Sequence, residues 1–395
     1  MGRRWRWAAA ALALPLSLVV LTGEPAVDRA TSDLPGVGVR YTMWLAFGGS
    51  PPSEQDLQAS AGHDAVVVLN SDRLEQAQTL RRLDPGIQLY QYRDLASVRG
   101  YDRSRATVTG VSFTQAAREG WLARDGRGEP IEWTPYPEHF QVRVDDPGYQ
   151  QAWVRGVTAA AGRPPWNGVW ADNDLVTLGY YSDATLAGST GHADSDRRLR
   201  DGLAELIAQA GPLLNAEDRG LIVNISEGRN DHARWAEHAR WGGGTVEHFM
   251  AWSRDGEPDI TGEQWLAEAQ LIGIGPRTLA STTVAAGDTR TCAYGYASFL
   301  MFASPGDGWQ CAWDGRYDRR WHTPETDIPL GVPVGEAEQH DGAWTRRFQT
   351  GWAAVNPTRQ AVTVQPPPGS RTLDGKRVDR VTLAPLTGVV TGLSN

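Results

Sequence analysis

Residues 168–174 read Gly-Val-Trp-Ala-Asp-Asn-Asp, an apolar run that ends in polar side chains, two of them carboxylates. A short apolar run bounded by polar turn residues is typical of a strand that is buried on both faces of a parallel sheet. When parallel strands close into a barrel, the polar residues at their carboxyl ends converge on one cavity. This stretch therefore predicts a parallel β-structure and marks where its chemistry would lie.

Seven further runs of this kind alternate with helical patterns, which indicates successive βαβ units. In chain order the eight predicted strands span residues 38–47, 64–70, 87–92, 167–172, 220–225, 245–250, 277–284 and 308–313. Eight alternations over about 275 residues match an α/β fold of the closed, TIM-type (β/α)8 barrel class. An open, doubly wound sheet of seven or eight strands is the alternative.

The two ends of the chain depart from this alternation. Residues 1–30 begin with arginines followed by an apolar run at 7–21, which is the layout of a secretory signal peptide. We expect a secreted, extracellular protein with no stable membrane insertion after cleavage; retention of this segment as an N-terminal anchor is the alternative. Residues 31–330 would then form the catalytic barrel. From residue 331 to 395, short β-like runs and the Pro-Pro-Pro-Gly at 366–369 predict a small antiparallel β domain.

Composition excludes several classes of function. The net charge of −9 and the pI of about 5.4 argue against nucleic acid as a partner. The eight histidines form no His-x-x-x-His pair, so we predict no metal site. The sequence has no Walker loop, no dinucleotide-binding Gly-x-Gly-x-x-Gly and no Gly-x-Ser-x-Gly elbow, so we predict no cofactor and no esterase chemistry. The two cysteines, Cys292 and Cys311, are an even pair in a chain with an export signal, which favours a disulfide bond.

Two carboxylates in predicted strands are the first candidates for catalysis. Asp172 ends the fourth run and Glu247 lies inside the sixth. A buried charge is costly unless it has a partner or a task, and two carboxylates across one cavity are what glycosidic bond cleavage requires. The structural alternatives are a turn or helix-cap aspartate for Asp172 and an arginine salt bridge for Glu247. Asp174 would share the face of Asp172 only if the strand continued, and is then a candidate for substrate binding.

Other polar and aromatic residues near strand ends are candidates for binding a sugar. The predicted substrate-binding set adds residues of the first, third, fifth and sixth runs to Asp174: Trp44, Tyr92, Asp94, Asn224 and His248. Each of them could instead be a core or turn residue.

Tryptophans and one long connection also point to a ligand face. The sequence has 17 tryptophans, and Trp121, Trp133, Trp309 and Trp321 lie in segments that look like loops. Exposed indole rings favour ligand binding, and packing of loops onto the barrel is the alternative. The connection after the third strand runs from residue 93 to about 146, and connections of this length are generally functional.

Four stretches together resemble a known family. Residues 167–174, Val223-Asn224, residues 246–249 and residues 347–357 are similar to the glycoside hydrolases called glycoside-hydrolase-like family fifteen. That family is similar to α-galactosidase-type and endo-α-1,4-polygalactosaminidase-type barrels. The resemblance implies a barrel glycosidase with Asp172 as nucleophile and Glu247 as general acid/base, where many related barrels carry Asp at the second position. It also slightly favours an α-linked substrate.

The sequence thus predicts a secreted O-glycosyl hydrolase that acts on an extracellular or cell-wall polysaccharide or oligosaccharide without a cofactor. A non-catalytic carbohydrate-binding barrel and a transglycosylase of wall remodelling are the alternatives.

Overall fold

The computed structural model describes residues 39–45, 50–103, 108–252, 258–314, 316–317 and 321–393. The predicted signal peptide lies outside these residues. Within the described ranges, no helix combines the length and the apolar character needed to cross a bilayer.

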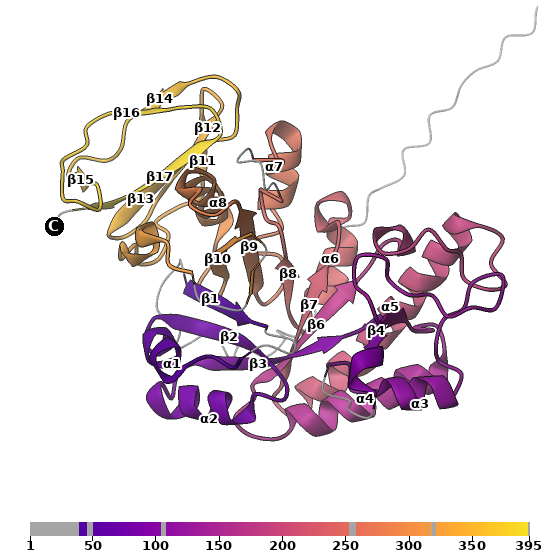
Figure 1. Ribbon diagram of the computed structural model, residues 1–395. Helices are drawn as coiled ribbons and strands as arrows, with labels where there is room; N and C mark the ends of the chain where they lie inside the picture. The colour runs from indigo at the N-terminus through magenta and orange to yellow at the C-terminus, as the bar shows by residue number, and fades with distance from the viewer. Residues whose placement is uncertain are drawn as a thin grey trace, which may run out of the picture. The chain divides into compact units, whose positions relative to one another are not determined.

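Eight parallel strands close into a barrel (Figure 1), which confirms the barrel prediction over the open sheet. Around the barrel the strand order is β1-β10-β9-β8-β7-β6-β3-β2, and the pairing of Val39 with Gly308 closes the ring. The strands are β1 (Val39–Trp44), β2 (Asp64–Asn70), β3 (Gln88–Asp94), β6 (Gly168–Asp174), β7 (Gly220–Ile225), β8 (Gly242–Val246), β9 (Thr278–Val284) and β10 (Gly308–Trp313).

Helices follow most of these strands and cover the barrel's outside. They are α1 (Glu54–Ser60), α2 (Leu74–Leu83), α4 (Pro147–Ala161), α5 (His192–Asn215), α6 (His232–Ala239), α7 (Gly262–Ala269) and α8 (Thr289–Phe302). The start of α4 shows how the sequence sets a boundary. Pro147 occupies the first turn, where its missing N–H has no partner to lose, and the Asp146 side chain accepts the N–H groups of Gly148 and Tyr149.

The long connection between β3 and β6 carries its own short elements. These are β4 (Ser97–Arg99), a 3₁₀ turn (Gly100–Asp102), α3 (Phe113–Arg118) and β5 (His139–Gln141), with β4 and β5 paired antiparallel. Because it starts where β3 ends, this connection lies at the carboxyl-terminal face of the barrel.

The sixth barrel strand differs from its prediction. It spans Gly242–Val246 instead of residues 245–250, so Glu247 lies just beyond the strand and not inside it. The three glycines were missed because glycine has a low strand propensity. They are needed for close packing: a Cβ on Gly243 would lie 2.7 Å from the Arg277 carbonyl, and one on Gly244 would lie 2.6 Å from the Trp235 ring.

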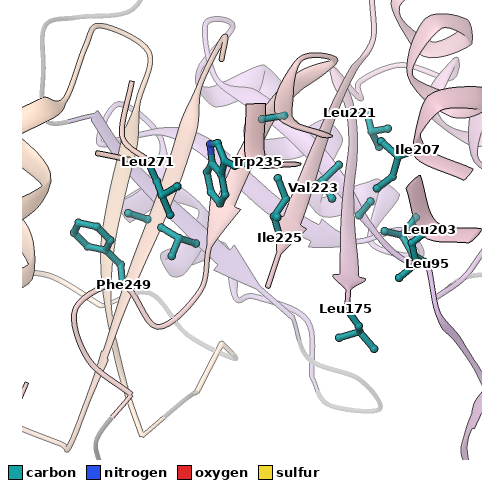
Figure 2. Packing of buried hydrophobic residues seen from close by; sticks show 14 of the residues in the cluster. Leu95, Leu175, Leu203, Ile207, Leu221, Val223, Ile225, Trp235, Phe249 and Leu271 are labelled. Carbon is teal, nitrogen blue, oxygen red and sulfur yellow. The ribbon is translucent and has the colours of Figure 1, made fainter. Parts of the chain in front are cut away.

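Alternation along β7 separates two cores. Leu221, Val223 and Ile225 face outward, where Figure 2 shows Leu221 beside Ile207 of α5. Ile222 points the other way, into a cluster in the barrel interior that includes Tyr92 and Trp170. Since side chains alternate along a strand, the same parity directs Asn224 inward, at the carboxyl end of β7.

The C-terminal part forms small antiparallel sheets, as predicted. One has the order β11-β12-β13-β17-β15 and the other pairs β14 with β16. Their strands are β11 (Glu338–His340), β12 (Ala343–Arg347), β13 (Gly351–Asn356), β14 (Val362–Val364), β15 (Ser370–Arg371), β16 (Val381–Leu383) and β17 (Thr387–Leu393). β17 packs on α8, with Gly388 against Ala293 and Ala297.

The predicted disulfide is present. Cys292 of α8 and Cys311 of β10 are bonded, with their Cα atoms 5.7 Å apart. The bond ties α8, which supports the C-terminal sheets, to the barrel wall.

Candidate active site

Asp172 and Glu247 meet across the side chain of Asn224. The Asn224 Nδ2 donates to Asp172 Oδ1 at 2.9 Å and to Glu247 Oε2 at 2.8 Å. These two oxygens are therefore at most 5.7 Å apart, the sum of the two bonds. Asn224 can bridge them because β7 lies between β6 and β8 in the barrel.

Asp172 receives two further hydrogen bonds. The Tyr92 hydroxyl donates to its Oδ2 at 2.6 Å, and the backbone N–H of Asn173 donates to its Oδ1 at 2.9 Å. Burial, followed by the charges of Glu247 and Asp94, raises the pKa of Asp172 to about 7, and the bonds from Tyr92 and Asn224 act in the opposite direction. Asp172 and Glu247 together therefore retain one proton close to neutral pH.

Glu247 is held by a residue that the sequence analysis did not select. The Tyr317 hydroxyl donates to Glu247 Oε1 at 2.6 Å. Burial and the charge of Glu247 raise the pKa of Tyr317, so its phenol stays neutral and remains a donor. The available signal was its place shortly after the eighth strand, at the barrel face where polar residues converge.

Asp174 is turned away from the pair. Asn173 has a φ of 68°, and the pairing of β6 with β7 shifts register between Ala171 and Asp174. This bulge breaks the alternation that would have put Asp172 and Asp174 on one face. Asp174 is buried instead against Arg234 and His238, each with a nitrogen 2.7 Å from its Oδ2. The structure thus does not bring the predicted substrate-binding Asp174 to the site.

Two other predicted binding residues also lie elsewhere. Trp44 is buried in the layer under α1 and α2, among Leu57, Ala77 and Leu80. Asp94 is fully buried and accepts bonds from Arg99 at 2.8 Å and from the Asn173 side chain at 3.0 Å. Asp94 therefore holds the turn after β6 in shape and influences Asp172 through its charge.

The long β3–β6 connection approaches the site through stacked rings. Trp133 stacks on Tyr181 with ring centres 4.1 Å apart, and the Tyr181 hydroxyl donates to the Asn173 side chain at 3.0 Å. After burial, the charges of Asp172 and Glu247 are the next causes that raise the pKa of Tyr181, which places it near both carboxylates. Tyr136 packs edge-on against Tyr181 and is exposed.

Most of the tryptophans singled out from the sequence are packing residues. Trp121 and Trp133 are buried within the long connection, and Trp309 is buried in β10 and is not in a loop. Trp321 is half-buried and stacks on Trp313 with ring centres 4.8 Å apart. For the three buried indoles, the packing interpretation is the one the structure supports.

His248 lies next to Glu247, at the edge of the site. Its Nδ1 is 3.2 Å from the Thr283 Oγ1, and its ring stacks on Trp252. Burial lowers the pKa of His248, which favours the neutral imidazole. Among the residues that the structure describes, no group of three His, Cys, Asp or Glu side chains is placed to hold a metal ion.

Several solved structures of carbohydrate-active enzymes match this chain, each at a TM-score below 0.5. Ega3 from Aspergillus fumigatus, solved with galactosamine, gives a TM-score of 0.45 at 10% identity and covers 74% of this chain and 96% of its own. The α-amylase from Geobacillus thermoleovorans, solved with acarbose, gives a TM-score of 0.49 at 9% identity and covers 91% of this chain and 98% of its own. The cycloalternan-forming enzyme from Listeria monocytogenes gives a TM-score of 0.47 at 10% identity and covers 91% of this chain and 42% of its own. At these TM-scores the likenesses carry no argument about this chain.

The family comparison is specific. No curated protein matches the chain. The model of the family described as hypothetical glycosyl hydrolase family 15 matches residues 81–352, a span that contains Asp172, Asn224, Glu247 and Tyr317. With more than half of its length matched, the chain belongs to hypothetical glycosyl hydrolase family 15.

Proposed function

We propose that the protein is an O-glycosyl hydrolase that acts with retention of anomeric configuration, with Asp172 as nucleophile and Glu247 as general acid/base. The observation that carries this proposal is the bridge through Asn224, which limits the nearest carboxylate oxygens to 5.7 Å. Retaining enzymes hold their two carboxyl groups ~5–5.5 Å apart, whereas inverting enzymes need ~6.5–9.5 Å to admit a water. The resemblance assigns the two roles in the same way.

The geometry supports a two-step displacement. Glu247 would give its proton to the glycosidic oxygen as the bond from that oxygen to the anomeric carbon breaks, while an Asp172 oxygen bonds to that carbon. Glu247, now ionised, would then take a proton from a water whose oxygen attacks the same carbon and releases Asp172. The donors Tyr92 and Asn224 would stabilise the Asp172 carboxylate when it leaves.

The chemistry needs one protonated and one ionised carboxyl group. Two carboxylates this close in a buried site do not both ionise easily, so the pair keeps one proton to higher pH than an isolated carboxyl would. Burial first, and then the charge of Glu247, raises the pKa of Asp172 to about 7. We expect the singly protonated pair to be the active form.

For the substrate we propose an extracellular or cell-wall polysaccharide or oligosaccharide, met by a secreted enzyme. Family membership supports a carbohydrate, and the exposed ring of Tyr136, which packs against Tyr181, suits a sugar. The α-linkage is supported by the resemblance alone. A transglycosylase would use the same residues with a sugar in place of water as the acceptor.

The test begins with product release. Wild type, Asp172→Asn and Glu247→Gln would be incubated with a panel of bacterial and fungal polysaccharides, with mass spectrometry as the readout. Asp201→Asn, an exposed carboxylate on α5, is the matched control. We expect release by wild type and the control only. Equal retention of a polymer by all proteins without cleavage would favour the carbohydrate-binding alternative.

The roles are then separated by adding azide to alanine variants. Azide should replace the nucleophile in Asp172→Ala and yield a glycosyl azide of inverted configuration. In Glu247→Ala it should attack the glycosyl-enzyme and yield a glycosyl azide of retained configuration. The opposite pattern would exchange the two roles, and an inverted hydrolysis product from wild type would refute the retaining mechanism.

A further inference from the structure

An exposed indole follows Glu247 by five positions in the chain. Trp252 is 64% exposed, the largest fraction among the big apolar side chains in the described part of the chain. Its ring stacks on His248 with centres 4.5 Å apart and planes 7° from parallel. One face of the indole is thus backed by a neighbouring ring, although exposing so much apolar surface has no benefit for folding.

The ring pair is tied to the same residues that hold Glu247. His248 contacts Thr283 Oγ1 at 3.2 Å, and Thr283 also hydrogen-bonds the Tyr317 hydroxyl that donates to Glu247. A chain of contacts therefore leads from Trp252 through His248, Thr283 and Tyr317 to Glu247.

The backbone fixes the indole as well. His248 and Met250 have φ values of 61° and 63°, so the chain turns sharply after β8. The Trp252 N–H then donates to Asp259 Oδ2 at 2.6 Å, and the Ala251 carbonyl accepts the Thr283 N–H at 3.3 Å. Two left-handed non-glycine residues within three positions are strained, and such strain is typical of functional sites.

We propose that Trp252, backed by His248, is the stacking platform of a sugar-binding subsite on the leaving-group side of the scissile bond. The proposal rests on the function proposed above, in which Glu247 protonates the leaving oxygen. The sugar bonded to that oxygen must lie next to Glu247, and the platform stacks on His248, the residue that follows Glu247 in the chain. A flat indole face suits the C–H face of a pyranose ring.

The charge next to the platform limits the class of sugar that can bind there. The Asp259 carboxylate accepts the Trp252 backbone N–H at 2.6 Å and therefore lies next to the platform. An ionised Asp259 repels a uronic acid and tolerates a neutral or positively charged sugar. The subsite would therefore select a polymer of neutral or amino sugars over an anionic one.

The experiment compares two kinds of substrate in the full chain. A polysaccharide from the panel places a sugar in the leaving-group subsite, whereas the glycosyl fluoride of the released sugar places only fluoride there. For Trp252→Ala we expect kcat/KM on the polymer to fall by about tenfold or more, with little change on the fluoride. Trp252→Phe should recover part of the loss, and Leu213→Ala, an exposed apolar residue on α5, should match wild type.

The outcomes separate the two proposals. If wild type cuts a polymer and Trp252→Ala cuts it equally well, the subsite is refuted and the hydrolase remains. An equal loss on polymer and fluoride also refutes the subsite, because it shows that Trp252 supports the fold or the carboxylates. If wild type releases no sugar from any polymer of the panel, the hydrolase is refuted and the subsite falls with it.

Discussion

At the scale of single residues, the properties of Asp172 follow from a contest between burial and hydrogen bonding. Burial and the charges of Glu247 and Asp94 favour the protonated form, while the bonds from Tyr92 and Asn224 favour the carboxylate. The first group of effects is larger, so the pKa lies near 7. Removing a hydrogen-bond donor to Asp172 should therefore change the pH dependence of activity, and removing the Asp172 carboxyl group should change the pH dependence of stability.

Tyr92→Phe removes the hydroxyl that donates to Asp172 Oδ2. That bond lowers the pKa of Asp172, so its loss should raise the pKa further. Because Asp172 must be ionised to attack the anomeric carbon, the acid limb of kcat/KM should move to higher pH by up to about one pH unit, if the bond contributes ~1.4 kcal/mol. A pH–rate profile measures this. Tyr294→Phe, whose hydroxyl bonds the distant Ile260 carbonyl, should leave the limb in place, and a shift to lower pH would contradict the prediction.

Asp172→Asn should abolish turnover and yet stabilise the fold at high pH. The pKa of Asp172 is raised in the folded state from 3.8 to about 7, so its contribution to stability is fully present below pH 4 and is lost as pH rises through 7. Removing the ionisable group should therefore raise the free energy of unfolding by ~1–3 kcal/mol at pH 8 and much less at pH 4. Denaturant melts at both pH values test this. A gain of equal size at both would mean that ionisation is not the cause.

At the scale of elements, the ends of β6 and β8 determine where Asp172 and Glu247 lie. The bulge at Asn173 ends the alternation of β6 so that Asp172 faces Asn224 and Asp174 faces α6. The glycines of β8 bring that strand close to Trp235 and Arg277, and Glu247 follows directly after the strand. The position of each catalytic candidate thus depends on a local irregularity.

Gly244→Ala should disturb β8 and with it Glu247. The new Cβ would lie 2.6 Å from the ring of Trp235, which is fully buried. Overpacking of this kind typically costs ~1–3 kcal/mol of stability, and we expect kcat/KM to fall with it. Gly126→Ala, where a Cβ meets nothing within 4 Å, is the control. Stability and activity equal to wild type would show that β8 can relax.

The disulfide also connects two elements, because it joins α8 to β10 across 19 positions of sequence. Replacing Cys292 and Cys311 together by Ala should lower the free energy of unfolding by ~3 kcal/mol, because the unfolded chain loses a cross-link. Chemical denaturation of the double variant should agree with that of reduced wild type. A free energy of unfolding equal to that of wild type would mean that the disulfide does not contribute to stability.

At the scale of the whole molecule, α8 connects the two parts. One of its sides packs on the barrel strand β9 and the other receives β13 and β17 of the C-terminal sheet. Figure 1 shows α8 between the barrel strands and that sheet. Stability of the barrel and of the sheet should therefore be coupled.

Gly388→Val tests this coupling. A Cβ at this position would lie 2.4 Å from the Ala297 Cβ and 2.6 Å from the Ala293 carbonyl of α8, so β17 must move away. We expect a loss of ~1–3 kcal/mol and a lower thermal midpoint for the entire protein by calorimetry. Gly335→Ala, in open space, should match wild type. A midpoint that stays unchanged would show that the sheet docks loosely.

The sequence alone was sufficient for the barrel, for the C-terminal β-structure, for the cysteine pair and for the choice of Asp172 and Glu247 as candidates. These depend on apolar periodicity and on the rule that strand ends converge, both of which are local or topological. Asn224 and Tyr92 were also selected this way, and the structure places both in contact with Asp172.

Only the tertiary structure decided which of the other candidates face the site. Asp174 and Trp44 face the helix layer, because a bulge and the pairing of strands set the direction of a side chain, and a one-residue change reverses it. Tyr317 contacts Glu247, which is 70 positions away in the sequence. Trp252 stacks on His248, which in turn contacts Thr283, 35 positions from His248. Residue types and spacing predict which elements form, but the geometry of a site comes from long-range packing that no local pattern encodes.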